Sequence, residues 1–250
     1  SGTVIDVGKN SSNLHVTGES KTITDGINGE NTLEKAASTG TIIAYSEGTW
    51  DQFKHRYGSE DSRIAQNDKD ATAINNGAKR KELTDTTATT AAKLQGLPSE
   101  INVYPDVVLA SKEGIAYMGD NKGIVNARGK TTAVNHSSII GYAKKGGKVN
   151  IYGEVTAQDR NTTSDNNKYK NIGAFAESGG TVNIEGRVTI NGIGAFAKGA
   201  NSKAQLLSGK DVIEAGTVGG LVATEGGYVR FDGGTINITK DNSRLFYADS

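Results

Sequence analysis

The sequence predicts an all-β fold: a right-handed parallel β-helix (solenoid) of roughly 21–26 residues per coil, a length typical of solenoid repeats, with one partly helical insertion. A phrase with an aromatic residue, a glycine pair and a short apolar run recurs, first as I-I-G-Y-A-K-K-G-G-K-V-N-I and then as I-G-A-F-A-E-S-G-G-T-V-N-I. Alternation such as V-N-I and V-R-F is the period of a strand with one buried face.

The small residue after the aromatic residue or valine of each phrase measures the length of a coil. It is Ala143, Ala176, Ala197, Ala223 and Ala248, and these numbers differ in turn by 33, 21, 26 and 25. The longest interval contains a polar insertion, Gln158 to Lys170. Going backwards, the same rule selects Met118, one coil before Ala143, and a much earlier copy at 42–46.

Equivalent residues of stacked coils should form columns along the solenoid. Two interior columns are expected, one of valines and one of aromatic residues. They are Val149, Val182 and Val229, and Tyr142, Phe175 and Phe196. The glycine pairs between the runs indicate turns that need positive φ. The hand of the coil is expected to be right because crossover connections between parallel strands prefer it.

The chain divides where the alternation stops. Residues 1–48 and 99–250 are predicted to be β-helix coils, and residues 49–98 a partly helical or irregular insertion. Within the insertion, Thr84 to Leu97 is expected to be a helix, because Gly96 and Pro98 provide stop signals.

Composition excludes several classes of function. Lysine plus arginine and aspartate plus glutamate both number 28, so the net charge is zero. This balance argues against binding nucleic acid or an anionic membrane through a broad basic surface. The chain has no cysteine and no stretch near the ~20 apolar residues of a membrane span. We therefore expect no cofactor, no nucleic-acid partner and no membrane span in this fragment.

The recurring phrases also carry a family resemblance. G-A-F-A and G-G-T-V-N-I-E-G resemble the passenger domains of type V autotransporters of Gram-negative bacteria, and the chain is most similar to the large fusobacterial outer-membrane adhesins (RadD-like). The resemblance covers residues 99–250 well and 1–48 weakly. It implies an exported, surface-exposed β-helix, anchored in the outer membrane in the full-length protein, of which this chain would be a fragment. It also implies adhesion to host cells or coaggregation with other bacteria.

Enzymatic function is disfavoured by the residues that are present. Inverting polysaccharide hydrolases place carboxylates on both sides of the scissile bond, and the sequence has no Asp-Asp pair. A serine protease would need a glycine-rich nucleophile turn, and Gly-Asp-Ser-Gly does not occur. His15, His55 and His136 are too far apart in sequence to indicate a metal site. We expect no catalytic residue and no metal ligand, and a polysaccharide-cleaving β-helix ranks third among the functions.

Binding is the remaining class, and the insertion supplies the candidate residues. These are Trp50, Phe53, His55, Arg56 and Tyr57. Aromatic rings stack on sugars or fill receptor pockets, and arginine adds a forked donor. The three aromatic residues are spaced three and four apart, so they could instead pack the insertion onto the β-helix, which is the commoner use of such spacing.

The sequence thus predicts a non-catalytic cell-surface adhesin segment. Its expected partners are a host-cell protein or glycan, or the surfaces of other bacteria. The alternative is a structural spacer: coils of a stalk that contribute reach and carry no ligand site.

Overall fold

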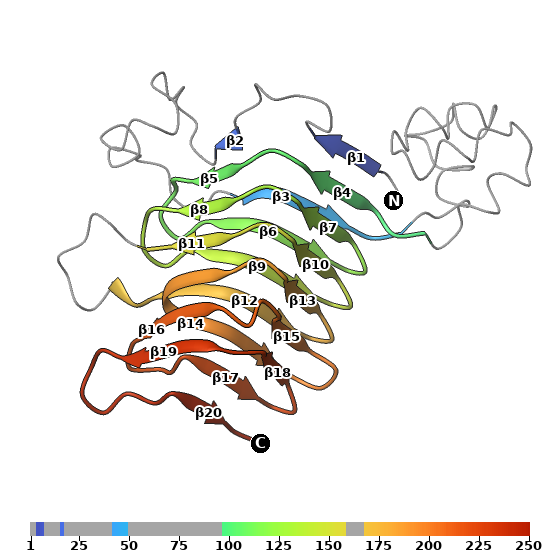
Figure 1. Cartoon of the computed structure of the whole chain (residues 1–250). Coiled ribbons are helices and arrows are strands. Elements are labelled where there is room, and N and C mark those ends of the chain that lie inside the picture. The colour runs from blue at the N-terminus through green and yellow to red at the C-terminus, as the bar shows by residue number, and fades with distance from the viewer. Residues whose placement is uncertain (1–3, 8–15, 18–41, 50–96, 159–167) are drawn as a thin grey trace, which may run out of the picture.

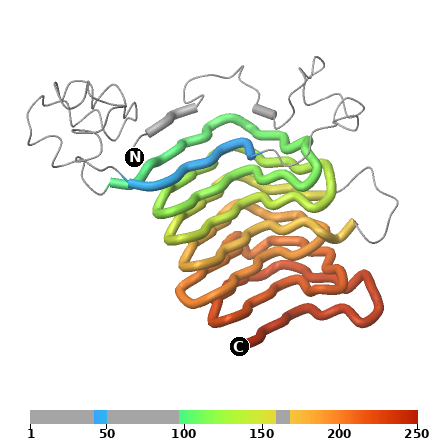
Figure 2. The backbone as a smooth tube through the Cα atoms, turned by 180° about the vertical axis from the view of Figure 1, so that it is seen from behind, coloured from blue at the N-terminus to red at the C-terminus, as the bar shows by residue number. Residues whose placement is uncertain are grey.

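The computed structural model describes residues 4–7, 16–17, 42–49, 97–158 and 168–250. It confirms the predicted fold class, because parallel strands stack as a β-solenoid of about six turns. The coils follow one another along a single axis, from the N-terminal strands at one end to the last strand at the other (Figures 1 and 2). Nearly all of the predicted insertion, and with it the predicted helix at 84–97, lies outside the described residues.

Each coil contributes strands to three faces. The first face is the seven-stranded sheet β1 (Val4–Val7), β4 (Glu100–Val103), β7 (Ile124–Ala127), β10 (Lys148–Ile151), β13 (Thr181–Ile184), β15 (Lys203–Leu206) and β18 (Tyr228–Phe231). The second face contains β2 (Val16–Thr17), β5 (Val107–Leu109), β8 (Thr131–Ala133), β11 (Val155–Ala157), the start of β14 (Val188–Lys198), β16 (Asp211–Ala215) and β19 (Gly234–Ile238).

The third face positions the candidate site. It contains β3 (Ile42–Glu47), β6 (Ile115–Asp120), β9 (Ile139–Lys144), β12 (Asn171–Glu177), the end of β14, β17 (Leu221–Thr224) and β20 (Phe246–Ala248). All neighbouring strands of this face pair in parallel. The alanines chosen from the sequence, from Ala143 to Ala248, lie in one register, which confirms the intervals measured from them.

The valine column is confirmed as part of the core. Val149 pairs with Val182, and the column continues through Ala204 to Val229. Val149 and Val182 are fully buried, and each such side chain contributes roughly 1.5–3 kcal/mol of transfer free energy. Val229 lies in the last described coil of the first face and is only partly buried against the same core.

The aromatic column was predicted to be interior, and this prediction is wrong. Tyr142, Phe175 and Phe196 are half-buried on the outer surface of the third face, whereas the alanine that follows each of them is fully buried. The reason is the narrow interior. A Cβ atom on Gly141 would lie 2.8 Å from Val182 Cγ1, so side chains of the other faces already fill the space behind this face. Each of the three rings is therefore flanked on both sides by a buried glycine or alanine, and the rings point outward.

The coil before Ala143 is also corrected by one residue. Gly119, not Met118, pairs with Ala143, and Met118 pairs with Tyr142. The copy at 42–46 follows the predicted rule, because Ser46 pairs with Gly119 and so lies in the register of Ala143. The displacement at Met118 allows Tyr117 to point inward, where it is fully buried and its hydroxyl lies 2.8 Å from Thr131 Oγ1.

The glycine pairs close the turns between the third and first faces, but the two glycines serve different purposes. Gly179 has φ +78°, and Ser178 before it has φ +49°, so two residues in a row are left-handed. Gly180 N–H donates to Glu177 O at 2.9 Å, which completes a type I′ turn. Gly180 itself is needed for close stacking, because its Cβ atom would lie 2.2 Å from Ala143 O. The prediction of positive φ is therefore confirmed for the first glycine of the pair.

A ladder of side-chain amides crosses the outside of the first face. Each amide nitrogen donates to the amide oxygen of the preceding coil, from Gln205 to Asn183 (2.6 Å), Asn183 to Asn150 (3.1 Å), Asn150 to Asn126 (2.8 Å) and Asn126 to Asn102 (2.9 Å). The ladder joins five consecutive strands on the outer surface, and it adds side-chain bonds to the backbone pairing of the coils.

The two ends of the predicted insertion meet. Thr49 and Pro98 form an isolated antiparallel bridge, and Ser99 N–H donates to Gly48 O at 2.8 Å. The chain thus leaves the third face after β3 and returns next to the same point, where β4 begins.

Candidate functional site

The five binding residues proposed from the sequence, Trp50, Phe53, His55, Arg56 and Tyr57, lie outside the described residues. Their role stays a prediction. The described coils present a different candidate, on the outer surface of the third face. We call this surface the ladder face and build it from two columns of side chains.

The first column, the apolar ladder, begins with Tyr45 on β3. It continues through Met118, Tyr142, Phe175, Phe196, Val222 and Tyr247, one residue per strand. Tyr45 is 43% exposed, whereas Met118 and Val222 are buried. A second apolar column, Ile139, Ile172 and Ile193, lies on the same strands three residues earlier.

The rings at the centre of the apolar ladder stack on one another. Phe175 lies 4.9 Å from Tyr142, with ring planes 6° apart, and 4.9 Å from Phe196, with planes 22° apart. Parallel pairing sets this spacing, because identical positions of neighbouring strands lie ~4.8 Å apart. The stacked rings present a flat apolar strip along the solenoid.

The second column, the charged ladder, lies two residues after the apolar ladder on each strand from β3 to β17. It contains Glu47, Asp120, Lys144, Glu177, Lys198 and Thr224. The signs along it are therefore negative, negative, positive, negative, positive and neutral. Lys144 Nζ lies 3.5 Å from Asp120 Oδ2, and Lys198 Nζ lies 3.5 Å from Glu225 Oε1.

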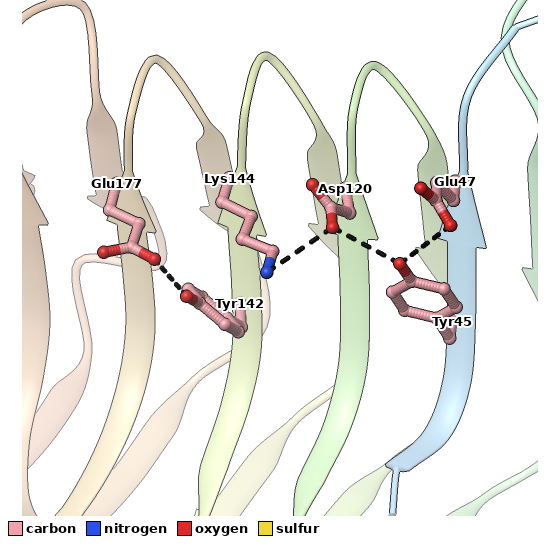
Figure 3. A network of polar contacts seen from close by, with 6 residues as sticks. All are labelled: Tyr45, Glu47, Asp120, Tyr142, Lys144 and Glu177. Carbon is pink, nitrogen blue, oxygen red and sulfur yellow. Dashed lines mark hydrogen bonds and ion pairs between the residues drawn. The ribbon is translucent and has the colours of Figure 1, made fainter.

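Phenol groups connect the two ladders at the N-terminal end of the face (Figure 3). Tyr45 Oη donates to Glu47 Oε2 at 3.0 Å and lies 3.3 Å from Asp120 Oδ2, which also contacts Lys144. Burial, and then the hydrogen bond to Glu47, raise the pKa of Tyr45 to about 12. The phenol is therefore a donor throughout the physiological range, and it holds the two carboxylates of neighbouring coils beside one another.

A second phenol makes the same kind of connection one coil further. Tyr142 Oη donates to Glu177 Oε1 of the next strand (Figure 3). Burial and this hydrogen bond raise the pKa of Tyr142 above its ordinary range. Lys144 Nζ lies 5.9 Å from the ring centre of Tyr142, within cation–π range. The side chains of both ladders are thus held in place by contacts between coils.

Asp120 is the most enclosed member of the charged ladder. The residue is only 6% exposed, and its Oδ1 atom is buried without a hydrogen-bond partner among the described residues. Within the described part of the chain, no group of three or more histidine, aspartate or glutamate side chains is placed to hold a metal ion. The arrangement is therefore one of fixed rings and fixed charges on a flat surface, which suits contact with another surface.

A small pocket lies beside the ladder face. Its volume is about 130 Å³, and it is lined by Tyr169, Ile193, the loop 216–219 and two lysines, Lys170 and Lys240. Pockets that enclose drug-sized ligands measure ~300–1,000 Å³. The size of this pocket therefore favours the open ladder face over the pocket as the main recognition surface.

The ladder face was not predicted from the sequence, because the aromatic column was assigned to the core. A signal was present. The phrases Y-S-E, Y-A-K, F-A-E and F-A-K all place a charged residue two positions after an aromatic one. In a strand, residues two apart lie on the same side. A column on the same side as charged residues is therefore an outer column, so these phrases indicate that the rings lie outside.

Among the described residues, no helix has the length and apolar character needed to cross a bilayer. Comparisons with known proteins identify no relative: no family model, no curated protein and no solved structure matches the chain.

Proposed function

We propose that this chain is a non-catalytic adhesin segment of a bacterial cell surface and that it binds through the ladder face. The observation that supports the proposal is the apolar ladder itself. It runs over seven strands on the outside of the solenoid, and its central rings are half-buried and stacked, whereas Met118 and Val222 within it are buried. Continuous apolar strips on an outer surface are typical of interaction sites.

The proposed partners are a receptor protein or glycan on a host cell or on another bacterium. Stacked rings offer a flat surface to another protein or to the apolar face of a sugar. The charged ladder beside them adds positively and negatively charged side chains that can form hydrogen bonds. The export and outer-membrane anchoring implied by the family resemblance belong to the same proposal. The candidate residues 50–57 of the insertion would provide a second contact region.

The competing proposal, a spacer without a ligand site, has one observation in its favour. The amide ladder ties five strands of the first face together by side-chain bonds, as a stiff rod would need. A spacer does not need an apolar strip on its outer surface, however, and exposed apolar side chains carry a risk of aggregation. The apolar ladder therefore favours the binding function.

Adhesion of protein-coated beads to cells tests the proposal. Beads that carry the purified chain are incubated with epithelial cells and with bacterial cells, and the bound beads are counted. A variant with three polar substitutions in the apolar ladder, Tyr142→Thr, Phe175→Thr and Phe196→Thr, is expected to lose most of the adhesion. A control variant makes three changes on the second face, Thr132→Ser, Thr156→Ser and Thr189→Ser, and should adhere as well as the native chain.

A further variant distinguishes adhesion through the ladder face from adhesion through the insertion. Residues 50–97 are replaced by a short glycine–serine loop, which the bridge between Thr49 and Pro98 makes geometrically simple. Loss of adhesion in this variant alone would assign recognition to the insertion. If the native chain fails to adhere to either cell type while its circular dichroism remains β-rich, the adhesin proposal is wrong and the spacer is supported.

A further inference from the structure

The charged ladder has an order that the adhesion proposal does not explain. Its signs are negative, negative, positive, negative, positive and neutral from β3 to β17. When the charged ladder of one copy is reversed and laid against that of another copy, residues of opposite charge face one another. Lys144 then faces Glu177, and Asp120 faces Lys198.

We propose that the ladder face binds a second copy of this chain, with the coils of the two copies in opposite order. The two-fold axis lies between β9 and β12 and runs parallel to the strands. The inference rests on the proposed function only in that it takes the ladder face as the contact surface; it adds the identity of the partner.

This axis preserves the position of each column along the strand. Rotation about the strand direction reverses the order of the coils but leaves the direction of the strands unchanged. The apolar ladder of one copy therefore lies on the apolar ladder of the other. Tyr142 faces the second copy's Phe175, Met118 faces its Phe196, and Tyr45 faces its Val222. The half-buried rings of Tyr142 and Phe175 supply most of the apolar surface that this contact buries, because Met118 and Val222 are already buried within each copy.

The same axis pairs the charged ladders with unlike signs. Lys144 faces the second copy's Glu177, and Asp120 faces its Lys198. Glu47 faces its Thr224, which is neutral. Because a two-fold contact is reciprocal, each of these pairs occurs twice. The two contacts between Lys144 and Glu177 join partly exposed side chains, whereas Asp120 is only 6% exposed and already pairs with Lys144 of its own copy, so its two contacts contribute less. No like-charge contact forms within the six strands that overlap.

Neighbouring registers are less favourable. An axis through β12 would place Glu177 against itself and Lys144 against Lys198. An axis through β9 would place Lys144 against itself and Asp120 against Glu177. Like charges in an interface cost free energy and discriminate against the wrong register. The order of the charged ladder therefore disfavours both of the adjacent axes.

A parallel arrangement of the two copies is disfavoured for a different reason. A two-fold axis along the solenoid would reverse the direction of the strands. The charged ladder of each copy would then lie over the isoleucine column of the other, for example Lys144 over Ile139 or Ile172. Charged groups would lose water without gaining a partner, which is costly.

The expected contact is weak. Six strands at ~4.8 Å and five residues at ~3.3 Å give a flat area of roughly 500 Å² per copy, which is below the ~800 Å² of a standard interface. Transient pairing of this kind suits surfaces that carry many copies, where avidity adds to each single contact. The test must therefore be made at high protein concentration.

Sedimentation equilibrium of charge-reversal variants tests the pairing. Lys144→Glu places two glutamates together at both reciprocal contacts, and Glu177→Lys places two lysines together. Each variant alone is expected to dimerise at least about tenfold more weakly than the native chain. An equimolar mixture of the two restores unlike charges at both contacts and should dimerise like the native chain. Lys148→Glu, the same change on the first face, serves as the matched control.

The mixture makes the result independent of folding defects. Lys144→Glu also removes the ion pair with Asp120 inside one copy, so its weaker pairing alone would be ambiguous. Mixing cannot repair a misfolded chain, and only complementary contacts between copies explain recovery. The dimer should weaken as salt is added, because the contacts at the edge are screened.

Three results would overturn the inference. The native chain could remain monomeric up to about millimolar concentration, far above the dissociation constants of specific transient pairs. It could associate equally well with Lys144→Glu or Glu177→Lys, or continue past the dimer, as head-to-tail contacts between the ends of solenoids do. The bead experiment keeps the two proposals apart: a monomeric chain that still adheres to cells retains the adhesin function, and a dimer that adheres to no cell retains only the pairing.

Discussion

The ring of Phe175 on β12 lies 4.9 Å from the ring of Tyr142 on β9, with the two planes within 6° of parallel. The two residues are 33 apart in the sequence, because the polar insertion after Gln158 lengthens this coil. The insertion leaves the register intact, and the parallel pairing of Ala176 with Ala143 keeps the rings in contact. The ladder is therefore a property of the stacking and not of a constant repeat length.

Replacing Phe175 by alanine tests how much this stack contributes to stability. The ring contacts neighbours on both sides, and its loss should lower the free energy of unfolding by about 2 kcal/mol. Urea unfolding followed by far-ultraviolet circular dichroism measures the change. Phe175→Leu retains apolar volume without the stacked ring and should cost about half as much. Equal stability of the alanine variant and the native chain would show that the rings do not support the fold.

The amide ladder of the first face predicts a cost for Asn150→Ala. Asn150 donates to Asn126 and accepts from Asn183, so the substitution removes two hydrogen bonds and interrupts the ladder in the middle. The expected loss is about 1–2 kcal/mol in urea unfolding. Thr156→Ala, on the outer surface of β11 in the same coil, is the control, and it should change stability by less than about 0.5 kcal/mol. A similar effect of both substitutions would contradict a special role for the ladder.

The repeat made the fold class predictable, because columns of equivalent residues leave a trace in the sequence even where coil length varies. The alanines from Ala143 to Ala248 are unevenly spaced in the sequence, yet they all occupy paired positions. The side of the strand on which a column lies was harder to predict. Alanine and phenylalanine alternate in G-A-F-A, and hydrophobicity alone assigns the larger residue to the core. The opposite holds here, because Val182 and Ile151 already occupy the space behind Gly141.

The shift at Tyr117 could not be predicted from local pattern. A-Y-M-G and G-Y-A-K align naturally by their tyrosines, yet the structure pairs Met118 with Tyr142. Which tyrosine points inward depends on a partner in another face, the hydroxyl of Thr131. Contacts of this kind between faces have no short-range signature. The candidate residues 50–57 lie beyond the described residues, so their assignment stays a prediction.

The glycine pair at 179–180 allows two causes of strain to be compared within one turn. Gly180→Ala would place Cβ 2.2 Å from Ala143 O, a backbone atom of the neighbouring coil, so the coils themselves must separate. We expect a loss of more than about 3 kcal/mol or failure to fold. Gly179→Ala meets no atom closer than 3.9 Å and is opposed only by its φ of +78°, which costs about 1–2 kcal/mol. Thermal unfolding of both variants should reveal this order, and the reverse order would contradict close stacking as the reason for the second glycine.

The buried pair of Tyr117 and Thr131 is suited to a double-mutant cycle. Both residues are fully buried, and their hydroxyl groups lie 2.8 Å apart. Tyr117→Phe or Thr131→Val alone leaves one hydroxyl without its partner and should cost about 1–2 kcal/mol. The double variant removes both hydroxyl groups and should be more stable than the sum of the single effects predicts, by about 1 kcal/mol. Additive effects in urea unfolding would show that the two hydroxyl groups are independently satisfied.

Asp211 predicts a dependence of stability on pH. The residue is fully buried at the start of β16. Its Oδ1 accepts hydrogen bonds from Val188 N–H at 2.7 Å and Ser208 Oγ at 2.6 Å, and its Oδ2 has no partner among the described residues. Burial raises the pKa of this carboxyl above its ordinary value, despite the opposing hydrogen bonds from Ser208 and Val188. Between the ordinary pKa and the raised one, the folded chain holds a proton that the unfolded chain has released.

The sign of the effect follows from that difference. Because the folded state binds more protons in this window, the free energy of unfolding falls as pH rises through it, and the contribution is largest below the ordinary pKa near 4. Asp211→Asn cannot titrate, so the stability of the native chain relative to this variant should decrease between pH 3 and pH 7. Ser208→Ala removes a bond that favours the charged form, raises the pKa further and should move the decrease to higher pH. Urea unfolding at several pH values measures both, and a constant difference between native chain and Asp211→Asn would show that Asp211 does not titrate abnormally.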